Sequence, residues 1–185
     1  NGLPNIERFD VSYNNVSIIP SGLQLPKLTI LSVGGNPLTD YASISEHTGL
    51  KELSIWRTEI SDLSPLANLS ELTTLHAQDN NIADLTPLAG LAKLDYLYIS
   101  NNEIVDVSPI GELVRMRLLW IAHNEIQDLS SFEGLTALQV LDARNNQIGD
   151  ISVLSGMPNL ESAYLESNLI SDIASLAGLV QLRTL

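Results

Sequence analysis

A period of 22 residues runs through the chain and limits its possible folds more than any other feature. Asparagine recurs on one lattice, which only Thr58 interrupts, at Asn14, Asn36, Asn80, Asn102, Asn124, Asn146 and Asn168. The first apolar position of each unit keeps the same spacing, at Ile6, Leu28, Leu50, Leu72, Leu94, Met116, Leu138, Leu160 and Leu182. Repeats of this length are typical of solenoids, in which similar units stack on one another.

The apolar residues within one unit have a spacing that predicts a single coil of such a solenoid. In one unit they are Leu72, Leu75, Ala77, Ile82, Leu85, Leu88 and Leu91. A step of two, as from Leu97 to Ile99, fits a short strand, whereas the later steps of three fit tight turns with inward side chains. One coil cannot cover its own apolar side chains, so stability comes from stacking. We therefore expect one domain of about eight coils over residues 1–185, and, because solenoids need polar caps, part of a longer chain.

Two polar columns share the lattice, and both have a structural interpretation. A buried asparagine must have its polar groups paired, and the backbone of the adjacent coil can supply the partners for a ladder. The second column consists of Asp40, Asp62, Asp84, Asp106, Asp128, Asp150 and Asp172. These aspartates resemble a calcium ladder, but calcium needs six to eight oxygens and each coil offers one carboxylate. We therefore predict Asx-type turns, in which each carboxylate accepts backbone N–H groups.

The run L-x-x-L-x-L-x-x-N-x-I-x-D-L-x-P-L occupies residues 72–88 and, with small changes, 94–110. It resembles the bacterial internalin type of leucine-rich repeat, although the 22-residue repeats of a phosphatase regulatory subunit share much of it. The resemblance implies an α/β solenoid that winds as a right-handed superhelix. Short parallel strands would line its concave face, and 3-10 or irregular turns its convex face. It also implies an extracellular or cell-surface bacterial protein that binds a partner protein with its strands.

Pairs such as Ser64-Pro65 and Ser108-Pro109 indicate where the outer turns begin. Proline suits the first position of a helical turn, and a hydroxyl just before it can accept a hydrogen bond from the backbone N–H groups there. We therefore expect short helical turns on the outer face, capped by these serine hydroxyls.

Composition excludes several functional classes. The 185 residues carry 22 acidic against 9 basic side chains, a formal net charge of −13 that repels nucleic acids and anionic lipid surfaces. The chain has no cysteine, so it has no disulfide, thiolate metal site or cysteine nucleophile. No apolar run approaches the length needed to cross a bilayer. We therefore predict no nucleic-acid partner, no membrane insertion in this segment and no cofactor.

The concave face holds the candidate binding residues. Five of the nine aromatic residues fall in the columns that flank the inward strand positions. Because neighbouring strands lie about 4.8 Å apart, side chains on adjacent strands should join into one exposed apolar patch over three repeats, with His123 and Arg144 as a polar rim. The predicted partner-binding residues are Trp56, Tyr96, Tyr98, Leu118, Trp120, His123, Val140, Arg144 and Tyr164.

Alternatives to protein binding stay open at this point. A sugar-binding platform would use the same aromatic rings with polar groups such as Asp142, Gln78 and Asn101. Aromatic residues also favour strands for stability alone, as in a spacer domain without a specific ligand. Ser54 and His76 should lie on adjacent strands, but an open face supplies neither an orienting buried acid nor a water-excluding pocket. We therefore predict no enzyme and no catalytic residue.

Overall fold

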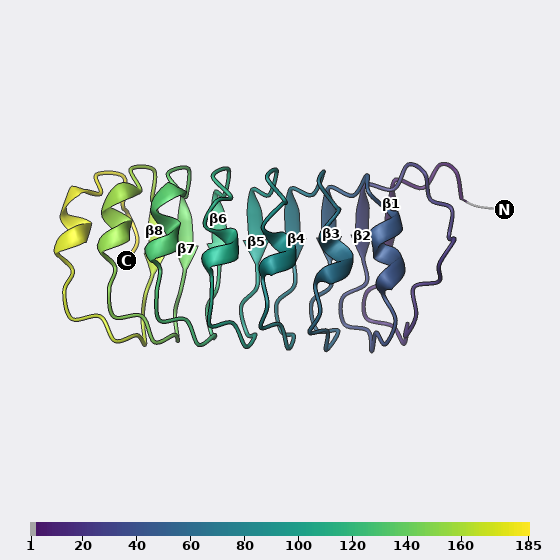
Figure 1. Cartoon of the computed structure of the whole chain (residues 1–185), viewed down its shortest axis with the longest axis horizontal. Helices are drawn as coiled ribbons and strands as arrows, with labels where there is room; N and C mark the ends of the chain where they lie inside the picture. Colours follow the sequence, from purple (N-terminus) through teal and green to yellow (C-terminus); the bar gives the residue numbers. More distant parts are fainter. Residues whose placement is uncertain (1–2) are drawn as a thin grey trace.

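The computed structural model describes residues 3–185. Eight strands of three residues form one parallel sheet in sequence order (Figure 1). They are β1 (Arg8–Asp10), β2 (Ile30–Ser32), β3 (Glu52–Ser54), β4 (Thr74–His76), β5 (Tyr96–Tyr98), β6 (Leu118–Trp120), β7 (Val140–Asp142) and β8 (Ser162–Tyr164). Each strand pairs with the next at an offset of 22 residues, as Tyr96 with Leu118, so lattice columns become columns in space.

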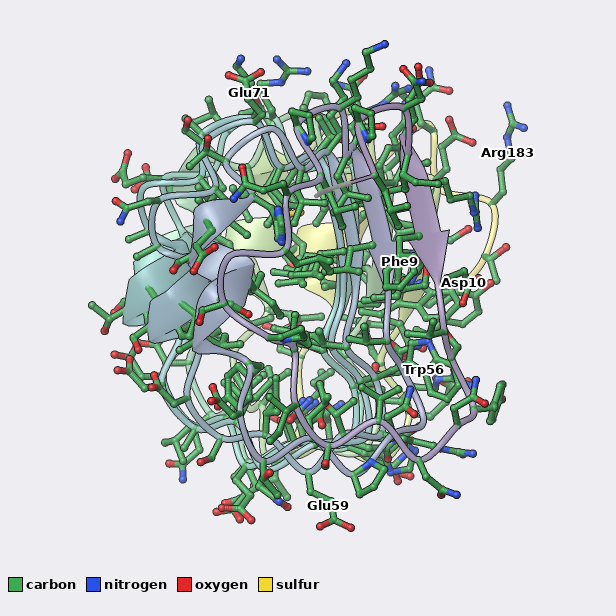
Figure 2. All side chains as sticks on the ribbon, turned by 90° about the vertical axis from the view of Figure 1, so that its right-hand side faces the viewer. Phe9, Asp10, Trp56, Glu59, Glu71 and Arg183 are labelled. Atoms are coloured by element: carbon green, nitrogen blue, oxygen red, sulfur yellow. The ribbon has the colours of Figure 1, made fainter. Side chains whose placement is uncertain are left out.

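Short 3-10 turns form the opposite wall of each coil (Figure 1). They are η1 (Ala42–Glu46), η2 (Ser64–Leu66), η3 (Thr86–Leu88), η4 (Ser108–Ile110), η5 (Ser130–Gly134), η6 (Ser152–Gly156) and η7 (Ala174–Gly178). An end-on view shows the strands on one side and the turns on the other (Figure 2). The predicted solenoid of parallel strands and 3-10 turns is confirmed, and within residues 3–185 its helical part is entirely of the 3-10 type. We call the two sides the strand wall and the turn wall.

The core fills the space between the two walls and runs through the stack. In the unit that begins at Leu72, all seven predicted inward side chains are buried, with at most 1% of their surface exposed. At the C-terminal end of the stack cover is lost: Ile173, which occupies the same inward position as Leu85, is 63% exposed, whereas Leu85 is 1% exposed. This contrast agrees with the expectation that neighbouring coils provide each other's cover.

The predicted asparagine ladder is present. Asn80 donates from Nδ2 to the carbonyl of Ala77 in its own coil at 3.0 Å and to that of Ile55 in the preceding coil at 2.8 Å. Its Oδ1 accepts the backbone N–H of Thr58 at 3.0 Å. The side chain therefore satisfies backbone groups that lie in the interior and have no ladder partner there.

Thr58, the one interruption of the lattice, replaces only part of this function. Its hydroxyl donates to the Ile55 carbonyl at 2.6 Å, as an asparagine would, but it has no amide oxygen to offer the preceding coil. In the preceding coil the Leu38 N–H therefore donates a hydrogen bond to the backbone carbonyl of Asn36, at 2.9 Å. The next residue after the threonine, Glu59, has a left-handed φ of 60°, which costs a non-glycine residue on the order of 1 kcal/mol.

The aspartate column forms the predicted Asx turns. Asp62 accepts the backbone N–H of Ser64 at 2.7 Å, and Asp84 accepts that of Thr86 at 2.8 Å. The expected serine cap is wrong, because the Ser64 hydroxyl donates to Asp62 Oδ2 at 2.7 Å and η2 has no side-chain cap of its own. The carboxylate is the better acceptor, so it takes both the backbone and the hydroxyl donor.

Candidate functional site

The strand wall places the predicted patch on three adjacent strands. Tyr96, Leu118 and Val140 occupy the first position of β5, β6 and β7 and lie opposite one another. Tyr98 and Trp120 occupy the third position of β5 and β6 and are paired in the same way. The second residue of each of these strands points inward and is fully buried, so the five side chains at the first and third positions lie on the outer side of the sheet. We call them the central window.

The aromatic side chains at the third strand position form a continuous row. The imidazole of His76 on β4 stacks on Tyr98, with ring centroids 4.4 Å apart and an interplanar angle of 9°. Tyr98 meets Trp120 edge to face, at 4.9 Å and 82°. Trp120 remains 41% exposed at the end of the row. Such pairs hold one another in place, so the window is ordered before any ligand arrives.

Burial in the row affects the protonation of its members. Burial lowers the pKa of His76 below 6.5, an effect that the nearby Glu52 carboxylate partly opposes. Burial also raises the pKa of Tyr98 above 10. Both rings are therefore uncharged near neutral pH. Sequence reasoning did not include His76 among the binding residues, although its position directly before Tyr98 in the same column was a usable signal.

Trp56 belongs to a second cluster. Its indole lies against Gly34, where an added Cβ would overlap the ring, and it meets Tyr13 edge to face at 4.7 Å and 64°. The glycine thus provides the space into which the indole leans, toward the first coils. The predicted binding residues therefore lie in separate clusters, and Trp56 contacts none of the central window's aromatic rings.

Arg144 and Tyr164 form a third cluster beyond the window. The guanidinium of Arg144 lies 5.3 Å from the centre of the Tyr164 ring. It also makes two hydrogen bonds to the buried Asp142 carboxylate, at 2.9 and 2.7 Å, and this contact raises the pKa of Arg144. A bidentate pair of this kind is fixed in direction. Arg144 is thus held within the wall on one side and offers an ordered cation on the other.

His123, the other predicted rim residue, lies where the chain leaves β6. Its φ is 55°, and the same left-handed turn recurs in every coil, with Asp79, Asn101 and Asn145 at the equivalent positions. The exposed imidazole contacts the amide of Asn145 at 3.3 Å through Nε2. His123 therefore borders the strand wall in the same coil as Trp120.

The geometry gives no support to a serine–histidine pair. Ser54 is buried, and within residues 3–185 no hydrogen bond joins it to His76, whose ring is stacked on Tyr98 instead. A nucleophile needs a base within hydrogen-bond reach. In the same part of the chain, no group of three or more His, Cys, Asp or Glu side chains is placed to hold a metal ion.

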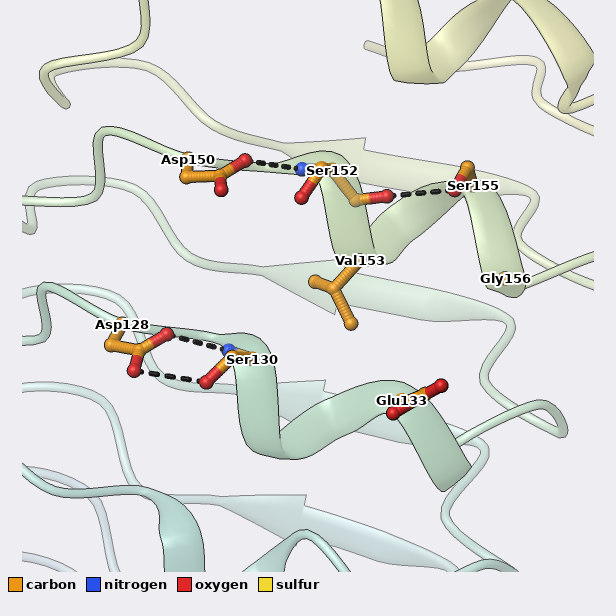
Figure 3. Close-up of a pocket in the computed structure, with 8 residues that line it drawn as sticks. All are labelled: Asp128, Ser130, Glu133, Asp150, Ser152, Val153, Ser155 and Gly156. Carbon is orange, nitrogen blue, oxygen red and sulfur yellow. Dashed lines mark hydrogen bonds between the residues drawn. The ribbon is translucent and has the colours of Figure 1, made fainter.

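Two hollows lie away from the strand wall, and sequence reasoning anticipated neither. One, of about 350 Å³, separates η5 from η6 on the turn wall (Figure 3). Its polar groups already bond locally, as Asp128 does with the backbone N–H of Ser130 at 2.7 Å. The other, of about 210 Å³, is apolar and lies in the first coils beside Phe9 and Leu23. Neither brings together an acid and a base for catalysis.

Comparison with known proteins decides the family. The sequence family described as "Leucine Rich repeats (2 copies)" matches residues 48–90, 70–113 and 114–156. The crystal structure of internalin C2 from Listeria monocytogenes is 32% identical, with a TM-score of 0.92 over 97% of this chain and 80% of that one. The chain belongs to the leucine-rich-repeat family and is of the bacterial internalin type. It is thereby a protein-interaction module in general terms, from a family whose members are typically not enzymes.

Other solved structures extend the likeness. Internalin F from Listeria monocytogenes is 27% identical to this internalin-type chain, with a TM-score of 0.75. The match covers 97% of this chain and 66% of internalin F. The plant peptide hormone receptor RGFR1, in complex with RGF2, shares the fold at 21% identity, with a TM-score of 0.83 over 97% of this chain and 32% of the receptor. No curated protein sequence matches the chain significantly. Within residues 3–185, no helix is long and apolar enough to span a membrane.

Proposed function

We propose that this internalin-type chain binds a protein partner on its strand wall, with the central window as the middle of the interface. The observation that carries the proposal is the uncharged aromatic row from His76 to Trp120. The outward positions of coils four to six hold no Asp, Glu, Lys or Arg, in a chain with 31 such residues. These positions are Thr74, His76, Gln78, Tyr96, Tyr98, Ser100, Leu118, Trp120 and Ala122. Interface centres are depleted of charge in the same way, because desolvating a charge is costly.

The order of the row supports tight binding. Association must offset the entropy lost when side chains become fixed at the interface. Tyr98 is already held between His76 and Trp120, so this cost is partly met by folding. Trp120 is then the principal anchor, since tryptophan and tyrosine dominate the energetics of interfaces. Tyr96, Leu118 and Val140 extend the apolar contact alongside it.

The remaining predicted residues border this centre. His123 and Arg144 supply hydrogen-bond donors at the edge of the window, and Arg144 is held in direction by Asp142. Tyr164 and Trp56 would contact a partner long enough to extend beyond the window toward the last or the first coils. The RGFR1–RGF2 complex is an example of a ligand held by a protein of this fold. We also propose that the chain acts outside the cell or on the cell surface, as its resemblance to internalins suggests.

The proposal is tested by affinity capture with three forms of the chain. The first is the wild type, and the second combines Tyr98→Ala with Trp120→Ala. The control combines Val105→Ala with Val114→Ala, which removes apolar side chains that are 53% and 54% exposed away from the strands. We expect a protein that wild type and control retain and the window variant loses. A partner retained equally by all three would reject the window, and binding to a glycan array that depends on Trp120 would favour sugar recognition.

A further inference from the structure

Acidic side chains collect along one edge of the solenoid. This loop edge runs from the third residue after each of the strands β2 to β8 to the next 3-10 turn, and so leaves out the outward strand-wall column of Gln78, Ser100 and Ala122. It carries eleven of the 22 acidic residues and one of the 9 basic residues, Arg57. The acidic residues are Asp40, Glu59, Asp62, Asp79, Asp84, Glu103, Asp106, Glu125, Asp128, Asp150 and Asp172. Within residues 3–185, Asp79 is the only one of them in a salt bridge, at 3.0 Å from Arg57.

The opposite edge has the reverse composition. This start edge comprises the lattice positions one and three residues before the strand position of each unit, on either side of the inward apolar position, and it carries six of the 9 basic residues against four acidic ones. The basic residues are Lys27, Lys51, Lys93, Arg115, Arg117 and Arg183. Two of its acids are already neutralised, Glu71 by Lys93 at 2.7 Å and Asp95 by Arg115 at 3.1 Å. Figure 2 shows Glu59 on one edge, with Glu71 and Arg183 on the other.

The central window lies between these two edges. Glu103 and Glu125 are exposed on the loop edge of the coils that hold Tyr98 and Trp120. On the start edge of the same region, Arg117 directly precedes β6 and donates to the Gln139 side chain at 3.3 Å. Acidic residues therefore predominate on one side of the strands and basic residues on the other, and the uncharged window occupies the middle.

We infer that the partner carries an apolar knob with lysine or arginine on the side that faces Glu103 and Glu125, and that this gradient sets its orientation across the strands. The inference rests on the proposed function. Charges at the rim of an interface act mainly on encounter and orientation, because they stay solvated and are screened by salt. The window would supply the affinity, and the loop edge would select a cationic partner over a neutral or anionic one.

The test uses a displayed library of short random peptides, selected on the full chain. We expect the peptides that require Trp120 for binding to combine an aromatic or large aliphatic residue with lysine or arginine. Selection is repeated on Glu103→Gln with Glu125→Gln, where the apolar residue should persist and the cationic preference should disappear. The matched control is Glu112→Gln with Glu133→Gln, which changes the net charge equally on the turn wall and should leave the cationic preference intact.

Synthetic peptides from the selection then give rates. For a cationic peptide, the loop-edge variant should slow association about three- to tenfold, with little change in dissociation, and added salt should remove the difference. The inference would be overturned if the peptides that require Trp120 showed no preference for lysine or arginine. It would also be overturned if the turn-wall control lost the cationic preference as fully as the loop-edge variant. In either case the proposed function would still stand. Peptides that bind equally to Trp120→Ala would reject the proposed function itself.

Discussion

Corresponding positions inside the coils hold nearly the same residue in every repeat, whereas corresponding positions on the strand wall change from coil to coil. Asn80, Asn102 and Asn124 make the same hydrogen bonds in three consecutive coils. The outward column over those coils instead holds His76, Tyr98 and Trp120. The difference separates two tasks: the repeated interior builds a rigid support, and the varied wall can be specific for a partner. Substitutions in the interior should therefore reduce stability, and substitutions on the wall should reduce binding.

The largest effect on stability is expected from Leu75→Ala. Leu75 is fully buried between the walls, and removing such a side chain costs about 2–5 kcal/mol of unfolding free energy through lost burial and a residual cavity. Urea denaturation followed by circular dichroism measures the change. Thr74→Ala, at the adjacent outward position, should change the unfolding free energy by less than about 1 kcal/mol. Similar losses for both would remove the distinction between interior and wall.

Asn124→Ala should have the next largest effect. Its amide donates to the carbonyls of Ile121 at 3.0 Å and Ile99 at 3.1 Å and accepts the N–H of Ile104 at 3.0 Å. Leaving these buried groups unpaired should cost about 1–3 kcal/mol. The exposed Asn68→Ala is the control in the same denaturation experiment. An unchanged midpoint for Asn124→Ala would mean that the ladder does not stabilise the coils.

Thr58→Asn should stabilise the chain by about 1 kcal/mol, since it restores the missing rung and lets Glu59 leave its left-handed conformation. The restored amide oxygen would accept the Leu38 N–H, which now bonds Asn36. A rise in the unfolding midpoint with an unchanged denaturant slope is the expected result. A lower midpoint would show that the third coil requires the threonine.

The lattice explains why the sequence predicted the fold and the wall on which each candidate binding residue lies. A strict period of 22 assigns each residue to a wall, so the column of Tyr96, Leu118 and Val140 follows directly from the amino-acid sequence. The period does not say how a side chain leans. Trp56 leans because Gly34 leaves room for its indole, and Arg144 turns to Asp142 because a carboxylate lies within reach. Both choices depend on pairs of neighbours, which differ between coils.

The smallest effect concerns pH and the strand wall. Because burial lowers the pKa of His76, the folded chain binds fewer protons there than the unfolded chain. This residue therefore reduces stability as the pH falls through the ordinary histidine range, and leaves it unaffected above that range. His76→Gln should show a smaller difference in unfolding free energy between about pH 7.5 and about pH 5 than the wild type. Burial also lowers the pKa of His47, so His47→Gln serves as the comparison variant in the same measurement.

Photo-crosslinking compares the two walls directly as binding surfaces. A photoreactive phenylalanine analogue is placed at Ser100 on the strand wall in one variant and at Ser152 on the turn wall in another. Binding through the window predicts adducts with a defined partner protein from position 100 and none from position 152, with the adducts lost when Trp120→Ala is added. The same adducts from position 152, or adducts at position 100 that persist without Trp120, would contradict it.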